Sequence, residues 1–515
     1  MLWFVVVLLL VIVTTLAFHK IWFTHWTRRG IAQFTPKFLF GDIGDVFLKP
    51  ADIGTVIAKL YEKSKHLPIC GIYFSFRRFL MINDPDLVKN VLVQNFSHFH
   101  DRGMKADLSV DPLGGNLFAL SGEKWKHLRT KLGPAFSPGK LKGMFPNLLR
   151  IGEVMLDYVD RHESEAIDVK ELSARYTTDI IASVGFGVDI DSINNQDDIF
   201  RKMGSKFFKP TLKNIFRAGC FFFLPKLLLA LRLKHVDQDV EDFIINLVLK
   251  TVEYREANEI VRKDVMQLLL QLRNTGVVAE DERWDLDGVS QTSKHISLAE
   301  ISAQAFVFFI GAYETSSTVM AYCLYEAARN KEIQKKIQEE LDEILSKNHG
   351  KFDYESIVKM QYLEKCIRET MRKYPSLPFF NRECTKDYPI PGTKTIIEKG
   401  TVVIISTLGL QRDERFFPDP NKFIPERFDH FVNESSKVPY YPFGDGPRTC
   451  IGMRLGQLQV KLGLALLFSR FSLNLVDESQ RNDEPKLSPK SILMAPIGGI
   501  TLNLHRRSAN DKVLF

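Results

Sequence analysis

The sequence is poor in cysteine. Its 515 residues include six cysteines, and no two of them lie within four positions of each other. This spacing excludes the paired-cysteine pattern of zinc sites and dithiol redox sites. The low density also excludes a secreted scaffold held together by disulfides. Any chemistry carried by cysteine must therefore come from a single thiol.

Several other features are missing. No G-x-G-x-x-G follows a strand and no P-loop is present, so the chain shows no nucleotide site of its own. Residues 50–515 contain no repeat, low-complexity run or long Gly/Ser linker. The net charge of +7 is a mild excess for this length and does not indicate a nucleic-acid partner. With 45% hydrophobic and 25% charged residues, the composition is that of a globular protein.

The N-terminus carries the longest apolar run. Met1 to Phe18 has no charged side chain, and as a helix it would cover ~27 Å, close to the ~30 Å hydrocarbon core of a bilayer. Trp22 and Trp26 follow where an aromatic belt would lie, and basic residues between Lys20 and Arg29 predict that the body faces the cytosol and Met1 the lumen. The alternative is a cleaved signal peptide. The lack of a basic residue before the run and of a small-x-small cleavage site favours a retained anchor.

The sequence is therefore divided into an anchor helix at residues 1–22, a connector at 23–50 and one large catalytic domain at 51–515. Two glycosylation sequons occur, at Asn95 and Asn433. Both would remain unmodified if the body is cytosolic.

Helical patterns far outnumber strand patterns, which predicts a mainly α fold with a small β region. Ser297 and Glu300 have the capping-box spacing, and a long, largely buried helix is expected from there to about Arg329. Strands are expected at 71–83 and 393–407, and further helices at 85–96, across most of 140–275, and at 331–346 and 354–374.

The segment from Phe207 to Leu231 is unusually rich in phenylalanine and leucine. Its longest apolar run, Ala218 to Pro225, is too short to span a bilayer. Two interpretations remain open: the segment dips into a membrane surface beside the anchor, or it forms a buried helix pair.

The sharpest local signal is the loop from Phe443 to Gly452, FGDGPRTCIG. Its glycines and proline exclude a regular element before Cys450, and a helical pattern begins directly after it. A cysteine at a helix N-terminus is favoured as a thiolate, which can be an axial iron ligand. Gly446 and Gly452 would let the backbone approach a flat macrocycle, and Arg448 would pair with a haem propionate. The alternative is a buried, inert cysteine.

At every fixed position, Phe443-x-x-Gly446-x-Arg448-x-Cys450-x-Gly452 matches the haem-binding signature of the cytochrome P450 family. The chain resembles this family over essentially its whole length. Residues 101–145 and 442–459 are most similar to insect microsomal members, especially the family numbered six. The resemblance implies the cytochrome P450 fold, a haem b cofactor, and Cys450 as its thiolate ligand.

A second family motif is E-x-x-R, which matches Glu369 and Arg372. At this spacing the two side chains share one helix face and can pair. The resemblance adds Arg427, from the segment Pro425 to Phe428, as a third member. We expect the triad to be structural and to hold the cysteine loop in place.

Further cofactor contacts are implied by the resemblance alone. Trp125 and Arg129 match W-x-x-x-R, whose members bind a haem propionate in the family, and Arg382 aligns with another propionate ligand.

The stretch Gly311 to Ser317 resembles the oxygen-binding part of the family's central helix. Ala312 would lie above the haem. Thr315 would interrupt the helix ladder, and Glu314 with Thr315 would relay protons to bound dioxygen. The alternative for Glu314 and Thr315 is a solvated helix surface. Tyr313 departs from the aromatic residue found in many relatives, which would alter substrate fit.

The implied reaction is insertion of one oxygen atom of O₂ into apolar small molecules such as plant toxins, insecticides or other xenobiotics. Two alternatives stay open: oxidation of an endogenous lipid or hormone, and a haem-thiolate isomerase or dehydratase. A haem-binding carrier without activity is disfavoured by the intact Thr315. The expected substrate walls, assigned by the same resemblance, are Leu117, Phe118, Phe306, Phe309, Ile310, Leu377 and Ile497.

Because no nucleotide site is present, electrons from NADPH must arrive through a separate protein. The resemblance implies NADPH–cytochrome P450 reductase, with cytochrome b5 as an optional second donor. A basic run formed by Arg129, Lys131, Lys140 and Lys142 is a candidate docking surface for an acidic partner. The alternative is a solvated basic face.

Overall fold

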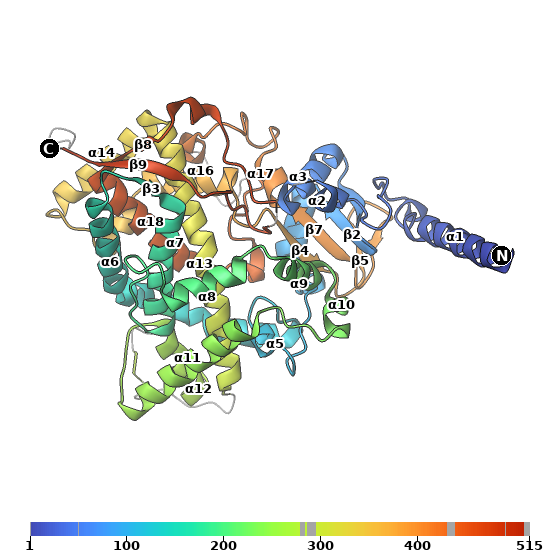
Figure 1. Cartoon of the computed structure of the whole chain (residues 1–515), viewed down its shortest axis with the longest axis horizontal. Coiled ribbons are helices and arrows are strands. Elements are labelled where there is room, and N and C mark those ends of the chain that lie inside the picture. The colour runs from blue at the N-terminus through green and yellow to red at the C-terminus, as the bar shows by residue number, and fades with distance from the viewer. Residues whose placement is uncertain are drawn as a thin grey trace.

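The computed structural model describes residues 2–49, 51–278, 284–285, 295–429, 438–489 and 491–508. Helices predominate in these ranges and the strands form small sheets, which confirms the prediction of a mainly α fold with a small β region. Figure 1 shows a large helical lobe and, beside it, a smaller lobe built around a sheet.

The helical lobe is arranged around one long central helix, α13 (Leu298–Arg329). The predicted capping box is present: the Ser297 hydroxyl accepts the Glu300 N–H, and the Glu300 carboxylate accepts the Ser297 N–H. α13 packs against α7 and α18 and is buried over most of its length. The helices around it are α5 (Gly122–Leu132), α6 (Pro138–Arg161), α7 (Val169–Ile180), α8 (Ile199–Phe208), α11 (Gln238–Ala257), α12 (Val265–Thr275), α14 (Lys331–Lys347), α15 (Tyr354–Lys359), α16 (Tyr362–Lys373) and α18 (Met453–Arg470).

The main sheet has the strand order β1-β2-β7-β4. The strands are β1 (Ile69–Phe74), β2 (Arg77–Ile82), β7 (Val402–Ser406) and β4 (Phe379–Glu383), and only the β2–β7 pair is parallel. The predicted strand region at 71–83 is the β1–β2 hairpin. α2 (Gly44–Leu48), α3 (Ile53–Ser64), α4 (Pro85–Lys89) and α17 (Thr407–Gln411) belong to this lobe.

Two further sheets are smaller. β3 (Ala166–Asp168), β9 (Thr501–Arg506) and β8 (Phe471–Leu475) form one, and β5 (Tyr388–Pro389) pairs with β6 (Ile396–Ile397) in the other. The strand pair expected at 393–407 is present as β6 and β7, but the two strands lie in different sheets. The helix expected at 354–374 is two helices, α15 and α16, separated at Met360 and Gln361.

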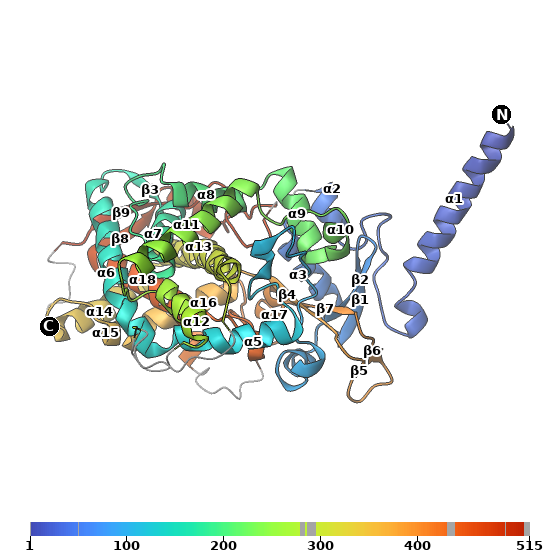
Figure 2. The same ribbon diagram turned by 90° about the horizontal axis from the view of Figure 1, so that it is seen from below.

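The N-terminal helix α1 (Leu2–Trp22) projects away from the body at the sheet lobe (Figures 1 and 2). Its C-terminal end is fixed to the β1–β2 hairpin. The Trp22 indole N–H donates to the Phe76 carbonyl at 2.7 Å, and the Arg78 guanidinium lies 4.0 Å from the centre of the Trp22 ring. Trp26 is buried against Gly71, where a side chain would collide with its ring. The assignment of Trp26 to an aromatic belt is therefore wrong.

The residues that follow α1 also belong to the body. Phe23, Ile31 and Ile43 are buried in the core of the sheet lobe, and the Asp42 carboxylate accepts the Tyr73 N–H at 2.7 Å. The division at residue 51 therefore leaves buried core side chains outside the catalytic domain, because the connector contributes to the core.

In the described residues, no helix combines the length and the apolarity that crossing a bilayer requires. The prediction of a spanning N-terminal anchor is therefore not supported.

The segment 207–231 contains the end of α8 and two short helices, α9 (Leu212–Phe223) and α10 (Pro225–Ala230). One face of this helix pair is buried through Cys220, Phe221 and Leu228, as one interpretation of the sequence expected. The opposite face is exposed, with Leu212 85% and Phe216 50% accessible. The pair is buried on one side only.

The two sequons differ in what the structure describes. The Asn95 amide nitrogen donates to Asn90 Oδ1 at 3.0 Å and to the Tyr388 hydroxyl at 3.3 Å, so this side chain is held against the body. Asn433 lies outside the described residues.

Candidate active site

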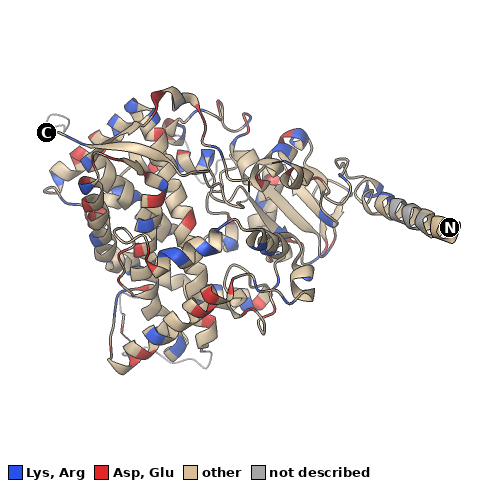
Figure 3. Cartoon of the chain, viewed as in Figure 1, with Lys and Arg blue, Asp and Glu red and all other residues tan. Residues whose placement is uncertain are grey.

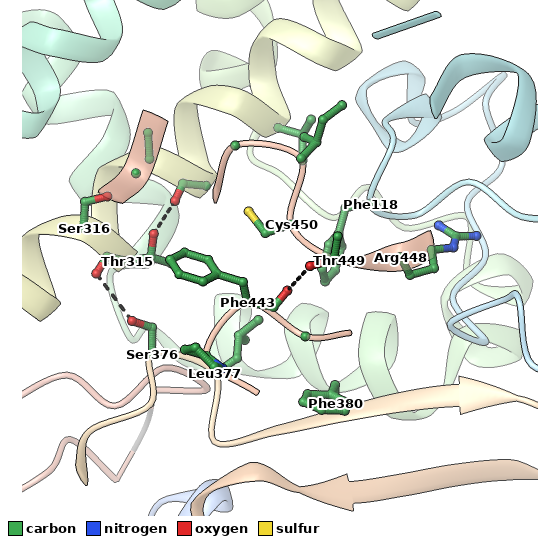
Figure 4. A pocket seen from close by; sticks show the side chains of 18 of the residues that line it. Phe118, Thr315, Ser316, Ser376, Leu377, Phe380, Phe443, Arg448, Thr449 and Cys450 are labelled. Atoms are coloured by element: carbon green, nitrogen blue, oxygen red, sulfur yellow. Dashed lines mark hydrogen bonds between the residues drawn. The ribbon is translucent and has the colours of Figure 1, made fainter. Parts of the chain in front are cut away.

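The loop before α18 is folded around Cys450. The Cys450 N–H donates to the Phe443 carbonyl at 2.9 Å, and the Thr449 hydroxyl donates to the same oxygen at 3.3 Å. These bonds fold the loop back on itself. The Cys450 side chain is left accessible from a cavity inside the protein (Figure 4). α18 begins three residues later, as the pattern predicted.

Burial raises the pKa of the Cys450 thiol above its ordinary value. The Gly452 N–H, which is directed at the sulfur, and the guanidinium groups of Arg129 and Arg102 act in the opposite direction but do not outweigh burial. The helix terminus alone therefore does not produce a thiolate here. A bound metal cation would supply the missing stabilisation, since metal coordination deprotonates a thiol.

The two glycines of the motif have different roles. Gly452 faces open space, since a Cβ placed there would meet nothing within 4 Å. Gly446 is required by the protein itself: it has φ +68°, and a Cβ would lie 2.0 Å from the Leu92 carbonyl oxygen. Gly446 does not line the cavity, so the prediction that it admits a macrocycle is wrong.

The cavity lies between this loop and α13 (Figure 4). Thr315 and Ala312 of α13 form one side, and Cys450, Phe443 and Gly452 form the other. Of the predicted walls, Leu117, Phe118 and Leu377 line the cavity. Wall residues that the sequence did not predict are Phe222, Val307, Phe308, Ser376, Phe379, Phe380, Asn381 and Ile492.

Four of the predicted walls do not line the cavity. Phe306, Phe309 and Ile310 lie on another face of α13, where Phe309 packs against Phe186 and Phe200. Residues 308, 311, 312, 315 and 319 line it instead, which is the i, i+3, i+4 face through Thr315. Ile497 is on the surface, 55% exposed. These four assignments are wrong because the helix phase and the position of the C-terminal loop were misjudged.

Thr315 does not interrupt α13, which continues unbroken to Arg329. Its hydroxyl donates to the Gly311 carbonyl at 2.6 Å, one turn earlier. Glu314 does not line the cavity: its carboxylate pairs with Lys170 Nζ of α7 at 3.0 Å, and both side chains are nearly buried. The structure therefore places only Thr315 of the predicted pair at the cavity.

Tyr313 also points away from the cavity. Its ring stacks on Phe208 with centroids 5.7 Å apart and lies under the Arg201 guanidinium at 4.9 Å. Gly204 of α8 leaves room for the ring, since a Cβ there would approach it to 2.5 Å. Tyr313 thus joins α8 to α13 and has no contact through which it would alter substrate fit directly.

Four arginines gather at one edge of the cavity. Arg129, Arg382 and Arg448 were predicted there, and Arg102 was not. Arg448 lies 3.9 Å above the Trp125 ring and donates to the His100 and Leu120 carbonyls. Arg102 donates to the Phe118 carbonyl at 2.9 Å. Arg382 keeps a buried Nε without a partner.

These guanidinium groups are short of negative charge. Burial and the neighbouring Arg382 and Arg129 lower the pKa of Arg448 to about 9, although Asp101 raises it. Burial lowers the pKa of Arg382 to about 10, and burial together with the other arginines lowers that of Arg102 strongly. Clustered, buried like charges are unfavourable unless an anion completes them. The two carboxylates of a haem fit this requirement, and Cys450 fits the metal at its centre.

The predicted triad is assembled and buried. Arg372 binds Glu369 through two hydrogen bonds of 2.7 and 2.9 Å, and Arg427 Nε lies 3.3 Å from the same carboxylate. Gln411 links the triad to the cysteine loop. Arg372 donates to the Gln411 carbonyl at 2.9 Å, and the Gln411 side chain accepts the Tyr441 N–H at 2.9 Å. The triad therefore reaches the loop through one glutamine.

The predicted basic run does not form one surface. Arg129 lines the cavity, and Lys140 is fully buried with its Nζ 4.7 Å from the Trp284 ring centre. Lys142 pairs with Glu355 at 2.5 Å. Basic and acidic residues alternate along the visible helices of this lobe (Figure 3). These basic residues are near one another in sequence but do not form one surface.

Comparisons with known proteins agree with this geometry. The family model Cytochrome P450 matches residues 35–503. Cytochrome P450 6d3 of Musca domestica is 37% identical, with 98% of this chain and 100% of the relative covered. Cytochrome P450 6a2 of Drosophila melanogaster is 38% identical, with 98% and 100% covered. Probable cytochrome P450 6d4 of Drosophila melanogaster is also 38% identical, with 98% and 99% covered.

The fold and the matches define a haem-thiolate monooxygenase, an oxidoreductase whose cofactor is haem b held by a cysteine thiolate. The chain belongs to the cytochrome P450 family, and the similar relatives are insect members of family six.

Proposed function

We propose that this cytochrome P450 inserts one oxygen atom of O₂ into apolar xenobiotics such as plant toxins and insecticides, with electrons supplied from NADPH by a separate reductase. One observation carries the proposal: the Cys450 thiol and the hydroxyl-bearing helix face at Thr315 lie across one largely apolar cavity, whose edge holds four arginines. Xenobiotics of this kind are apolar, and the walls at Phe118 and Phe222 are aromatic.

We assign Cys450 as the thiolate that would hold the haem iron. Trp125, Arg129, Arg382, Arg448 and the additional Arg102 would hold the propionates. Phe443, Ala312 and Gly452 line the space for the ring. When bound, the haem supplies the iron at which O₂ is reduced, and a thiolate ligand favours cleavage of the O–O bond.

Thr315 has the proton-handling role. Its hydroxyl already donates to the Gly311 carbonyl, so its oxygen can accept a hydrogen bond from a water molecule and hold that water in the cavity. Glu314 serves as the more distant acid. It must separate from Lys170 before its carboxyl group reaches the cavity, which makes proton delivery dependent on that ion pair.

The electron donor is proposed to be NADPH–cytochrome P450 reductase, with cytochrome b5 as an optional partner. Exposed basic side chains of α5, Lys124 and Lys126, lie on the same helix as Trp125 and Arg129 of the cavity edge. They replace the predicted basic run as the candidate docking surface for an acidic partner.

We propose attachment to the endoplasmic reticulum membrane, with the catalytic body in the cytosol. Support comes from exposed apolar side chains on α1, such as Trp3 and Phe4, on α2, and on the outer face of α9. Deletion of residues 2–21 should lower the fraction of protein that floats with phosphatidylcholine vesicles. An unchanged fraction would contradict attachment through α1.

The function is tested by reconstitution of the full chain with an insect reductase and NADPH. A panel of plant compounds and insecticides should give products that carry one ¹⁸O atom from labelled O₂, with NADPH consumed in step. Products formed without NADPH, or from a peroxide alone by rearrangement, would refute the proposal. Incubation with an endogenous lipid or hormone in the same assay separates the two substrate classes.

A further inference from the structure

A buried His–Asp pair lies behind the cavity wall and has no role in the proposed chemistry. The ring Nδ1 of His235 lies 2.5 Å from Asp111 Oδ2, and the His235 backbone N–H donates to the same oxygen at 3.1 Å. The side chains are 7% and 1% exposed. The two residues are 124 positions apart in sequence, so the pair joins distant segments.

The imidazole is held by its surroundings as well as by Asp111. Phe221 of α9 stacks on it with ring centroids 5.2 Å apart, and Phe306 of α13 meets it edge-on at 5.5 Å. Because an ionised carboxylate only accepts, Nδ1 carries the proton of this bond. His235 Nε2 and Asp111 Oδ1 are buried without a partner. Two buried polar atoms without partners cost free energy, so the His235–Asp111 hydrogen bond is offset in part by the burial of these atoms.

Each partner is directly connected to a cavity wall. Asp111 precedes the tight turn Pro112–Gly115, which leads to the wall residues Leu117 and Phe118. The ring stacked on His235 belongs to Phe221, whose neighbour Phe222 lines the cavity. The two wall rings, Phe118 and Phe222, meet edge to face with centroids 6.3 Å apart. The walls are thus joined by an aromatic contact at the cavity and by a polar contact behind it.

The edge-to-face aromatic contact tolerates a range of ring separations, whereas the hydrogen bond requires a narrow donor–acceptor distance. A bulky ligand can push the rings away from each other, but it cannot lengthen a buried hydrogen bond without loss of that bond. We propose that His235 is a positioning residue which, through Asp111, fixes the spacing of the Phe118 and Phe222 walls and so sets the upper size of ligand that the cavity admits. The inference deepens the proposed function and rests on it for the identity of the site.

The experiment measures ligand size selection in the full-length holoenzyme. Imidazole and clotrimazole both bind haem iron through a ring nitrogen and differ greatly in bulk. Dissociation constants for both are taken from optical titration, and each variant is first checked for the thiolate-type band of the reduced carbon monoxide complex.

The test variant is His235→Phe, which keeps an aromatic ring against Phe221 and Phe306 but removes the hydrogen bond. We expect the affinity for clotrimazole relative to that for imidazole to rise about fivefold, because arrangements with Phe118 and Phe222 further apart become more populated. His235→Gln, whose amide can still donate to Asp111, should stay near the wild-type ratio.

Asp342→Asn is the matched control. Asp342 forms a buried pair with Arg507 at 2.6 Å, and neither residue lines the cavity. An unchanged ratio in His235→Phe, an equal shift in Asp342→Asn, or a shift in His235→Gln as large as that in His235→Phe would each overturn the proposal. Absence of NADPH-driven oxygenation in the wild type would refute the proposed function instead, and leave the ligand ratio readable.

Discussion

The molecule contains two groups of buried arginines that are built in opposite ways. In the triad, Arg372 and Arg427 share the Glu369 carboxylate, and Arg372 also donates to three backbone carbonyls. At the cavity edge, Arg102, Arg129, Arg382 and Arg448 lie together, and the nearest carboxylate oxygen to Arg448, that of Asp101, is 3.6 Å away. One group is complete within the chain and the other is not.

The difference distinguishes arginines that hold the fold together from arginines that bind a ligand. A buried cation that has its counter-ion in the chain holds segments together, and removal of one partner leaves an uncompensated charge. A buried cation cluster without its anions is unfavourable until a ligand supplies them. Burial lowers the pKa of all four arginines at the cavity edge, Arg102, Arg129, Arg382 and Arg448.

The largest effect is expected when the cavity loses Cys450, the proposed ligand of the haem iron. Cys450→Ala should abolish the thiolate-type band of the reduced carbon monoxide complex, because no other thiol lines the cavity within the described residues. Buried Cys323→Ala is the control and should keep the band. Retention of the band in Cys450→Ala would contradict the ligand assignment.

The complete group is tested by Glu369→Ala, which leaves two arginines without their carboxylate. The free energy of unfolding should fall by about 3–5 kcal/mol, as measured by denaturant titration of the holoenzyme. Glu343→Ala removes an exposed pair with Lys347 and should cost less than about 1 kcal/mol. Equal losses in the two variants would show that burial of the triad does not increase its contribution to the free energy of unfolding.

Arg382→Gln tests the contrast through the stability of the cofactor-free chain. This stability should not fall when an arginine of the cavity edge is replaced, but it should fall when an arginine of the triad is replaced. Haem should dissociate from Arg382→Gln about tenfold faster, as measured by transfer to apomyoglobin, while the cofactor-free chain is no less stable than wild type because a repulsive charge is gone. Arg372→Gln should destabilise both forms. A destabilised cofactor-free Arg382→Gln would place that residue with the structural group.

The ion pair between Lys170 and Glu314 is an intermediate case: it is formed in the structure, and the proposed proton relay requires it to separate. Thr315→Ala should keep haem and lower the product formed per NADPH by about tenfold, with hydrogen peroxide released instead. Lys170→Met should change this coupling about threefold, because Glu314 loses the cation that holds its carboxylate away from the cavity. Unchanged coupling in Lys170→Met would remove Glu314 from the proton path.

The cysteine loop and the Glu369–Arg372 pair were predictable because their constraints are local, whereas Arg427 was assigned by the family resemblance. Gly446, Arg448 and Cys450 lie within five residues, and Glu369 and Arg372 share one helix face, so sequence spacing already contains most of their geometry. Arg102 was missed because nothing near it in sequence indicates that it lies beside Arg448 in space. Phe222 was missed because a phenylalanine-rich segment does not reveal which of its rings faces inward.

The errors on α13 have a different cause. Phe306 and Phe309 are as apolar as the true wall residue Phe308, and burial against α7 and α8 rewards the same residue types as a cavity does. Counting back from Thr315 by three, four and seven residues would have given Ala312, Gly311 and Phe308. Glu314 was misplaced because its partner, Lys170, lies 144 positions earlier in the chain.

The packing of Trp26 against Gly71 connects the N-terminal helix to the sheet that carries part of the cavity wall. Gly71 is the third residue of β1, and β1 belongs to the sheet whose strand β4 carries Phe379 and Phe380 of the cavity wall. The C-terminal end of α1 is therefore fixed to the sheet lobe by packing and hydrogen bonding. The orientation of α1 relative to the substrate cavity therefore depends on an indole that fits against the sheet only where the strand carries glycine.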